Sequence, residues 1–568
     1  MSDNLYDKLS KERKELQEKG LVPEWYTTAG YQMFKEKYEY ETNGRSVRGQ
    51  FERIAKTAAK HLENTPLYSE AETWFFNLLW NGWLSPSTPV LANMGTNRGM
   101  PVSCSGGTVD DSIDGFYSDL REVALLTKYG FGTSSYLGDI RPRGSKISVG
   151  GKASGVMPVF KDRIEAMRTV AQGTARRGAW AGYLPIDHGD FNELCDYVFN
   201  NPDDANVGWV ISDAFIDRLN KNDLDAQTRF QKALKLKMIQ GKGYFCFIDK
   251  INRKRPVAYT NNGLIVKASN LCDEITLFAD SEHTFTCVLS SKNVAKYPEW
   301  KNTKAVFWST IFLDCVASEF ISKAENIPGL EKAVRATKKG RALGLGQCGF
   351  HTLLQSQMIP FESFEAHMLS QEIQKHIHDE SLEASKKLAE IFGEPEWCKG
   401  TGLRNTHRMA IAPTKSTALL MGGISEGINP DPAMVYTQNT SAGEVSRVNP
   451  VLLNIMKEKG IYDKKHIKEI VEKQGSVQHV EWLSQEQKEV FKTAFEINQK
   501  AIIRMASARG IFLDQWQSLN LFFAADEDEA WISEVHQEAF EDENILGLYY
   551  VYTQAGVQAS KGECEACM

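Results

Sequence analysis

Helical stretches alternate with short apolar runs between residues 156 and about 440, and this alternation constrains the fold most. Helical patterns such as VFKDRIEAMRTVAQ and AVFWSTIFLDCVASEFISKA are separated by short apolar segments, among them YFCFID, ITLF and MAIAPT. Parallel neighbouring strands need a long crossover, which is usually a helix. The pattern therefore predicts an α/β body with parallel strands.

The flanking regions have a different character. Residues 1–84 carry charged runs and apolar residues at helical spacing, which predicts a helical N-terminal domain. Residues 85–155 are rich in Gly, Ser and Pro, with strand-like pieces such as STPVLAN and VSCSGG. Residues 441–545 look mainly helical, and the aromatic run ILGLYYVYT predicts a strand. We expect a catalytic domain over 85–554 and a mobile tail over 555–568.

The composition is that of an ordinary globular protein. Of 568 residues, 42% are hydrophobic and 24% charged, which excludes disorder over most of the length. The net charge of −7 gives no general attraction for nucleic acids or anionic membranes. The charged start is unlike a secretory signal, and no apolar run reaches the roughly 20 residues of a membrane span. We expect a cytoplasmic protein without nucleic acid or membrane partners.

Ten cysteines are scattered along the chain, except for one CxxC formed by Cys564 and Cys567 in the last five residues. A zinc site would need two further ligands, and the tail offers none nearby. The spacing therefore favours a redox dithiol that reaches another site, with two adventitious exposed thiols as the alternative. We expect no metal bound by this chain.

The segment SNLCDEITL carries three groups with chemical potential. If it is a strand, Asn270, Cys272 and Glu274 lie on one side of it, because alternate residues share a face. An amide, a thiol and a carboxylate that meet at one substrate make a workable catalytic trio. The alternative is a loop with a buried cysteine. Cys104 and Cys287, taken singly, are most simply core residues.

The segment AIAPTKSTALLMGG places hydroxyl groups at the start of a predicted helix. Free N–H groups at such a start suit a phosphate. Ordinary N-capping by Thr414 or Ser416 explains the pattern equally well.

Two further pairs stand out. Arg176 and Arg177, between glycines, form a flexible basic loop that could sense a phosphorylated ligand. Tyr549 and Tyr550 are adjacent, so in a regular strand one would face the core and the other the surface.

In combination these motifs resemble the catalytic large subunit of class I ribonucleoside-diphosphate reductase. The ordered motifs are STP, SC, DDSI, IRPRGS, RRGAWA, NLCDE, a lone Cys, PTKST, LYY and the terminal CxxC, and they run from about Leu84 to the end of the chain. The resemblance implies a ten-stranded α/β barrel, made of two antiparallel halves of five parallel strands, with Cys272 on a finger loop inside. It implies reduction of ribonucleoside diphosphates to deoxyribonucleoside diphosphates for DNA synthesis.

The resemblance also implies roles for single residues. Cys272 would become the thiyl radical that takes the 3′-hydrogen of the substrate. Glu274 would be the base for the 3′-hydroxyl, and Asn270 would hydrogen-bond the ribose. Cys104 and Cys287 would reduce the 2′ carbon and end as a disulfide.

Other roles concern electron supply. Cys564 and Cys567 would reduce that disulfide and be reduced in turn by thioredoxin or glutaredoxin. Tyr549 and Tyr550 would relay the radical from a small subunit, whose metal cofactor generates it.

The resemblance also implies which residues contact the substrate diphosphate and the nucleotide effectors. The diphosphate would be held by Thr88, Ser103, Thr414, Lys415, Ser416 and Thr417. The site for dNTP and ATP effectors, at the interface of a homodimer, would involve Asp111, Ser112, Arg141 and, in the loop 172–181, Arg176.

Two departures from the family pattern are visible. Only some 84 residues precede SPSTP, so we expect no N-terminal ATP-binding cone in this chain. Lys415 stands where several relatives have an acidic residue. The alternatives are an adenosylcobalamin-dependent reductase of the same fold and a non-catalytic nucleotide-binding regulator. The tyrosine pair argues against the first, and the intact cysteine, amide and carboxylate set against the second.

Overall fold

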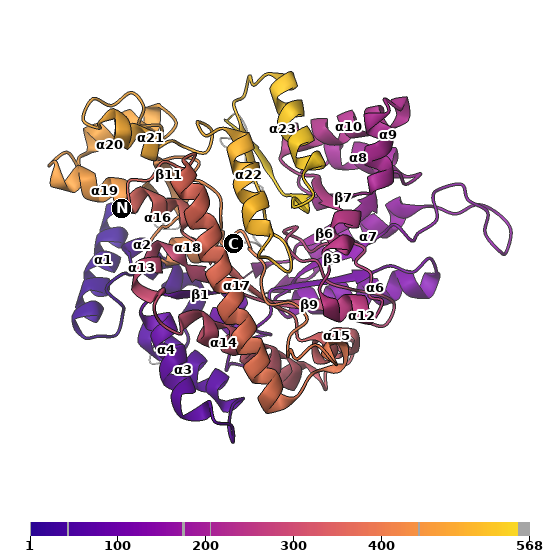
Figure 1. Ribbon diagram of the computed structural model, residues 1–568, viewed down its shortest axis with the longest axis horizontal. Coiled ribbons are helices and arrows are strands. Elements are labelled where there is room, and N and C mark those ends of the chain that lie inside the picture. Colours follow the sequence, from indigo (N-terminus) through magenta and orange to yellow (C-terminus); the bar gives the residue numbers. More distant parts are fainter. Residues whose placement is uncertain (1, 42–44, 173–175, 205, 441–442, 555–568) are drawn as a thin grey trace.

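The computed structural model describes residues 2–41, 45–172, 176–204, 206–440 and 443–554. Helices open the chain: α1 (Ser2–Glu18), α2 (Thr28–Met33), α3 (Val47–Lys60) and α4 (Tyr68–Trp80). Side chains cap two of them, since Thr27 accepts a hydrogen bond from Gly30 N and Ser46 accepts one from Gly49 N. These helices, indigo in Figure 1, lie on the opposite side of the molecule from α8, α9 and α10, and the predicted helical N-terminal domain is confirmed.

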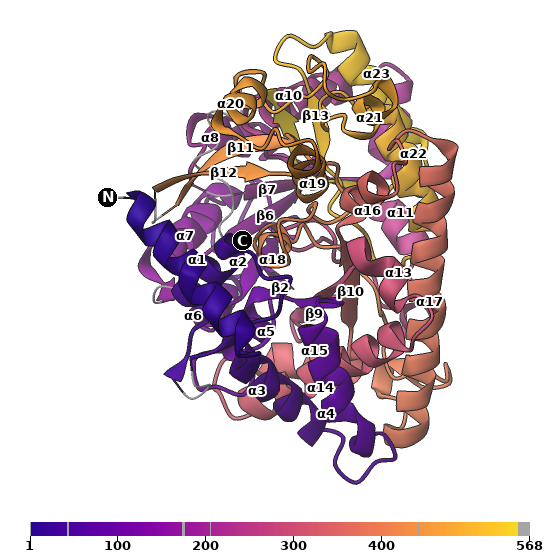
Figure 2. The same cartoon turned by 90° about the vertical axis from the view of Figure 1, so that its left-hand side faces the viewer.

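The first half of the barrel contains five parallel strands. In spatial order they are β2 (Cys104–Thr108), β3 (Gly132–Tyr136), β6 (Trp180–Pro185), β7 (Asn206–Ile211) and β8 (Tyr244–Phe247). The long connections between them contain α6 (Ile113–Lys128), α7 (Val156–Thr169), α8 (Phe191–Asn200), α9 (Asp213–Asn220) and α10 (Leu224–Gln240). The predicted parallel α/β pattern is confirmed, and Figure 2 shows helices around the central strands.

The second half begins at β9 (Phe285–Asn293), which is antiparallel to β2 and parallel to β10 (Leu343–Cys348). A short edge strand, β1 (Leu84–Pro86), also pairs with β9. From β10 the backbone hydrogen bonds continue to segments 407–411 and 516–518, through Leu343 N to His407 O and Ile411 N to Trp516 O.

The barrel closes through the end of the chain. β13 (Leu521–Phe523) lies parallel to β15 (Val551–Thr553). Just before β15, β14 (Gly547–Leu548) pairs antiparallel with β8 of the first half. The two halves therefore meet antiparallel at both junctions, β2–β9 and β8–β14, as the resemblance implies.

Several local expectations are wrong. STPVLAN is not strand-like but forms α5 (Thr88–Asn93), whose first turn contains Pro89, a residue already fixed in helical φ. ITLF belongs to a loop, because its backbone bonds to side chains rather than to a neighbouring strand. The long helical pattern near residue 490 divides into α21 (Gln485–Val490) and α22 (Gln499–Gly510).

One helix shows that the expectation of no apolar run as long as a membrane span is wrong. α14 (Ala305–Ala324) has 20 residues and is apolar enough to cross a membrane. However, 72% of its most apolar 18-residue stretch is buried inside the protein, where the helix packs against α4, β9 and α17 (Phe364–Phe392). It has the properties of a core helix.

The hydrophobic core extends without interruption from the N-terminal helices through the barrel. A smaller, separate cluster lies within residues 434–491, where α19 (Pro450–Glu458) and α20 (Lys464–Glu472) pack with α21. This cluster forms the orange lobe at the upper left of Figure 1.

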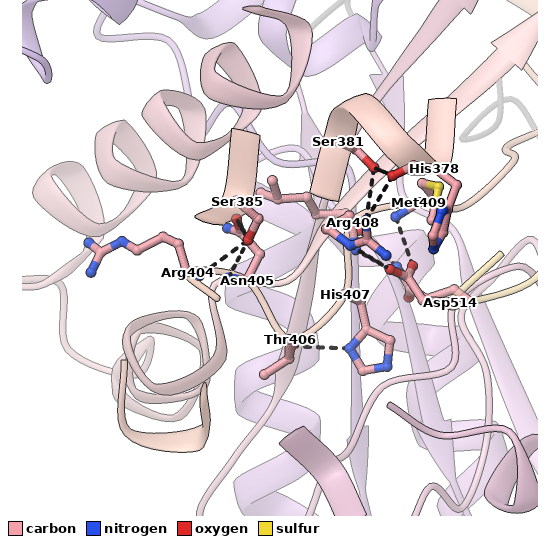
Figure 3. A network of polar contacts seen from close by, with 12 residues as sticks. His378, Ser381, Ser385, Arg404, Asn405, Thr406, His407, Arg408, Met409 and Asp514 are labelled. Carbon is pink, nitrogen blue, oxygen red and sulfur yellow. Dashed lines mark hydrogen bonds and ion pairs between the residues drawn. The ribbon is translucent and has the colours of Figure 1, made fainter. Parts of the chain in front are cut away.

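A polar network fixes segment 404–409 between α17 and the loop at residue 514 (Figure 3). Asp514 accepts hydrogen bonds from the backbone N–H groups of Arg408 and Met409 at 3.0 and 2.9 Å. Arg408 also donates to Ser381 of α17. Because Gln515 follows Asp514 directly, the network also sets where Gln515 enters the barrel interior.

Behind this network, Asp314 of α14 pairs with Arg341 at 2.8 Å and accepts a hydrogen bond from Asn405 at 2.9 Å. Burial alone would raise the pKa of Asp314, but the neighbouring cationic guanidinium of Arg341 outweighs it, and the pKa lies below its usual value. The carboxylate is therefore ionised and paired.

We predict that Asp314→Ala lowers the free energy of unfolding by about 3–5 kcal/mol, because it leaves the Arg341 charge buried without compensation. Chemical denaturation monitored by circular dichroism measures this. The control is Glu383→Ala, which removes the exposed partner of Lys304 and should cost about 1 kcal/mol or less. Equal effects of the two variants would contradict the prediction.

Candidate active site

Residues 264–280 form a loop without helix or strand that runs through the barrel, and we call it the finger loop. SNLCDEITL is therefore a loop and not the strand on which the shared face of its three groups depended, and Cys272 is buried in this loop. Asp273 adopts a left-handed backbone conformation with φ of 59°, which turns the chain at Cys272. Three hydroxyl groups donate to finger-loop carbonyls: Ser134 to Ser269 at 2.9 Å, Tyr183 to Asn270 at 2.6 Å and Ser518 to Cys272 at 2.7 Å.

The buried Asn270 side chain organises the turn. Its Oδ1 accepts hydrogen bonds from the backbone N–H groups of Glu274 and Ile275, at 3.0 and 3.1 Å. Its Nδ2 donates to the sulfur of Cys104 at 3.4 Å. One amide thus connects the finger loop to β2.

Cys104 and Cys287 are direct partners across the antiparallel junction between β2 and β9. Both are buried thiols. Gln515 donates to the sulfur of Cys287 at 3.8 Å and to the carbonyl of Leu343 at 2.9 Å. Burial raises the pKa of the Cys287 thiol well above its usual value, although the Gln515 amide opposes this, so the thiol form is favoured.

Glu274 is fully buried, and Ser518 donates to its Oε2 at 3.3 Å. Its Oε1 has no hydrogen-bond partner among the described residues. Burial raises the pKa of Glu274 to about 7, against the hydrogen bonds from Asn270 and Ser518. A carboxyl group with this pKa can accept and release a proton near neutral pH.

A pocket of about 530 Å³, including its open mouth, brings these groups together. Cys104, Cys272 and Glu274 line it, with hydroxyl residues from β1, α5, β9 and the start of α18 (Lys415–Leu420). Asn270 and Cys287 lie behind this lining. Four of the lining hydroxyl groups are buried without a hydrogen-bond partner in the described part of the chain: Ser85, Ser87, Ser103 and Ser290. Since buried polar groups are normally paired, the pocket suits a ligand rich in hydrogen-bonding groups.

The structure brings five of the six residues predicted to contact the diphosphate into one pocket. Thr88, Ser103, Thr414, Ser416 and Thr417 all line the pocket, whereas Lys415 is not part of the lining. Thr414 precedes α18, but its side chain does not cap the helix, because it accepts a hydrogen bond from Gly427 N at 2.8 Å. The N-capping explanation for Thr414 is therefore wrong.

The tyrosines lie side by side at the break between β14 and β15. The ring centroids of Tyr549 and Tyr550 are 4.2 Å apart, with their planes tilted by 59°. Tyr244 of β8 joins them, 4.8 Å from Tyr549, and its hydroxyl donates to that of Tyr550 at 3.3 Å. The default expectation of opposite faces is wrong, because the strand is interrupted at these residues.

The predicted effector residues lie outside the pocket. Arg141 forms an ion pair with Asp111, and Ser112 caps α6 by accepting from Gly115 N at 3.0 Å. Arg176 falls in the short hairpin of β4 (Ala171–Gln172) and β5 (Arg176–Arg177), and its side chain lies outside what the structure describes. Cys564 and Cys567 also lie outside the described residues.

Sequence reasoning missed several residues of the site. They are Ser85, Ser87, Ser290 and Ser291 in the pocket wall, Gln515 and Ser518 beside the finger loop, and Tyr244 in the aromatic cluster. The serine pairs in SPSTP and VLSS were the available signal for the wall. No cluster of three His, Cys, Asp or Glu side chains suited to a metal ion is present within the described residues.

Comparison with known families decides the relationship. The family model "Ribonucleotide reductase, barrel domain" matches residues 102–225, 217–399 and 395–551, and the model "Ribonucleotide reductase, all-alpha domain" matches residues 24–99. The chain belongs to the ribonucleotide reductase family. The protein is therefore an oxidoreductase.

Relatives of this ribonucleotide reductase chain include a frog virus 3 (isolate Goorha) protein named as a ribonucleoside-diphosphate reductase large subunit, 32% identical over 86% of this chain and 90% of that protein. The large subunit of Danio rerio is 26% identical over 94% of this chain and 76% of its own length. Among solved structures, the Actinobacillus ureae class Id ribonucleotide reductase alpha subunit is 34% identical, with a TM-score of 0.86 over 95% of this chain and 99% of that one. These matches favour a catalytic large subunit over a cobalamin-dependent reductase or a regulator.

We predict that mild oxidation links Cys104 to Cys287. Directly opposed residues of an antiparallel pair have Cβ atoms about 4.5–5.5 Å apart, which is close to disulfide geometry. Peptide mapping by mass spectrometry under non-reducing conditions identifies the link. Cys195, buried in α8, is the control and should remain a free thiol. Preferential linkage of Cys104 to Cys272 would contradict the prediction.

Proposed function

We propose that this chain is the catalytic subunit of a ribonucleoside-diphosphate reductase, which replaces the 2′-hydroxyl of a ribonucleoside diphosphate by hydrogen. The observation that carries the proposal is the pocket in which two thiols and a carboxyl group face a wall of unpaired hydroxyl groups. A ribose needs several hydrogen-bond partners, and its reduction needs thiols and a base at one place.

In the proposed reaction Cys272, as a thiyl radical, takes the 3′-hydrogen, while the Glu274 carboxylate accepts the 3′-hydroxyl proton. The 2′-hydroxyl then leaves as water. Cys104 and Cys287 supply two electrons and two protons and become a disulfide, and Cys272 returns the hydrogen to the 3′ carbon. The β2–β9 register, which places Cys104 opposite Cys287, supports this assignment.

Asn270 is proposed to hydrogen-bond the ribose through its Nδ2, the atom that donates to Cys104 in the described state. Thr88, Ser103, Thr414, Ser416 and Thr417 are proposed to hold the diphosphate, because their side chains line one pocket. Lys415 would contribute charge from outside the lining.

Radical supply is proposed to come from a small, metal-containing subunit through Tyr550 and Tyr549 to Cys272. The ring separation of 4.2 Å supports a relay between the tyrosines. Cys564 and Cys567 are proposed to reduce the Cys104–Cys287 disulfide by thiol exchange and to be renewed by thioredoxin or glutaredoxin.

Regulation is proposed at a dimer interface, where Asp111, Ser112, Arg141 and Arg176 would read dNTP or ATP effectors. The Asp111–Arg141 ion pair supports a common site for two of these residues. We further propose a helical domain over 1–84, a barrel over 85–554, a redox tail over 555–568, and a cytoplasmic location.

We predict that kcat/KM rises with pH through about pH 7 and is level above it, because Glu274 must be ionised to act as a base and burial raises its pKa to about 7. Below that pH the rate should fall about tenfold per pH unit. Initial rates with the small subunit, between about pH 5.5 and 8.5, measure this profile.

Two variants test the assignment of that profile. Glu274→Gln should abolish turnover. Glu122→Gln is the matched control, because burial also raises the pKa of Glu122 to about 7 but its side chain pairs with Thr284 outside the pocket. If kcat/KM of Glu122→Gln no longer falls below pH 7, the pH dependence is due to ionisation of Glu122 rather than of Glu274.

We predict that Cys272→Ser abolishes reduction while equilibrium binding of the nucleoside diphosphate is retained. The double variant Cys564→Ser with Cys567→Ser should lose thioredoxin-dependent turnover but keep activity with a small dithiol. Product analysis with the small subunit checks both. Full thioredoxin-dependent activity of the double variant would exclude the tail as the route of electron supply.

A further inference from the structure

Lys237, near the end of α10, is fully buried beside the tyrosine pair. Its ammonium group donates to three backbone carbonyls, at 3.3 Å to Gly243, at 3.1 Å to Leu548, and to Tyr549. We call this arrangement the carbonyl clamp. An ammonium group has three donors, so the clamp uses all of them.

The clamp lies where the final strand changes partners. β14 pairs with β8 of one barrel half, and three residues later β15 pairs with β13 of the other half. The carbonyl of Tyr549 falls in this interval and that of Leu548 lies at the end of β14, and both bond to Lys237. Buried carbonyls need donors, so Lys237 replaces the strand that is missing at this point.

The interruption also explains the ring arrangement of the tyrosines. In a continuous strand, adjacent side chains point to opposite faces. Here the strand is interrupted between Leu548 and Val551, and the two rings lie 4.2 Å apart. The Tyr549 N–H bonds to the Leu519 carbonyl and the Tyr550 N–H to the Asn520 side chain, so the backbone of the pair is held from both sides.

Asp273 connects the clamp to the finger loop. It follows Cys272 directly, accepts a hydrogen bond from Tyr183 at 3.2 Å, and its Oδ2 lies so close to Gly547 that a side chain there would meet it at 2.6 Å. Burial lowers the pKa of Lys237 to about 7, and the charge of Asp273 opposes this shift. Burial also raises the pKa of Asp273 well above its usual value, and no ion pair joins its carboxyl group to Lys237 among the described residues, so Asp273 acts here through its close packing against Gly547.

The geometry points to Lys237 as a positioning residue of the radical relay: its ammonium group fixes the backbone at Leu548 and Tyr549, and Asp273, beside Cys272, packs against Gly547 next to this clamp. This inference rests on the proposed function, since the relay belongs to it. Lys237 acts on Tyr549 through the main chain and contacts neither substrate nor reacting atoms. The clamp and Asp273 together set Tyr549 relative to Cys272.

The test compares Lys237→Met with Lys250→Met in the full chain. Lys250 of α11 (Ile248–Arg253) is a matched control, because it is also buried and donates to three carbonyls, those of Ala539, Phe540 and Asp542. Both lysines also lie over phenylalanine rings of β8. The two variants should therefore lose similar stability, and only Lys237→Met should disturb the tyrosines.

With the small subunit present, we expect Lys237→Met to lower kcat by about 100-fold, the effect of a misplacement near 1 Å, with KM unchanged. Lys237→Arg should recover part of the loss, because it retains the charge and the donors. Lys250→Met should keep kcat. Equal kcat values for both methionine variants, or a loss confined to KM, would overturn the inference.

A second measurement does not depend on turnover. With 3-fluorotyrosine at position 549 of the isolated chain, the ¹⁹F resonance should shift in Lys237→Met and stay in place in Lys250→Met. If Lys237→Met does not fold, Asp273→Ala, which removes the carboxyl group packed against Gly547, should shift the resonance and lower kcat. If the resonance does not move in the variant, the inference about the carbonyl clamp is wrong. If the resonance moves but the wild-type chain shows no reductase activity, only the proposed function is wrong.

Discussion

The finger loop is the constraint on which the rest of the site depends. A loop inside a barrel has buried N–H and C=O groups that no strand pairs, and each must find a partner. Ser134, Tyr183 and Ser518, which come from both barrel halves, donate to its carbonyls, and the N–H of Trp516 donates to Glu274 O. These hydrogen bonds pair the buried polar groups of the loop and also fix the position of Cys272. The stability of the loop and the placement of its thiol therefore depend on the same contacts.

The antiparallel junctions of the barrel have a chemical consequence. Within a parallel half, strands are joined through helices, and strands of the two halves meet in antiparallel register where the halves join. At the β2–β9 junction Cys104 meets Cys287, and near the β8–β14 junction Tyr244 meets Tyr549 and Tyr550. The thiol pair and the aromatic cluster therefore both lie near seams of the barrel.

Sequence patterns report local burial, and this limits what they could predict. The α/β class with parallel strands follows from alternation, although only β8 among β6, β7 and β8 was predicted from the sequence. The motif order led to the finger loop and the pocket. The register of Cys104 with Cys287 is set by pairing between distant segments, which no local period encodes. ITLF looks like a strand because it is apolar, yet it is part of a loop in which Ile275, Thr276 and Leu277 are buried. Lys237 lies in an ordinary helical pattern, and its three carbonyl partners are set by the tertiary fold alone.

Burial acts on the acids and thiols of the site in the same direction but with different results. Removing water raises the pKa of any group that ionises to an anion. Glu274, which starts near 4.5, is brought to about 7, where both protonation states are populated. Cys287, which starts near 9, is moved further from neutrality and stays a thiol. The proposed reduction needs a base and a thiol that keeps its proton, and this single effect favours both at Glu274 and Cys287, because the carboxyl and thiol groups begin on opposite sides of neutral pH.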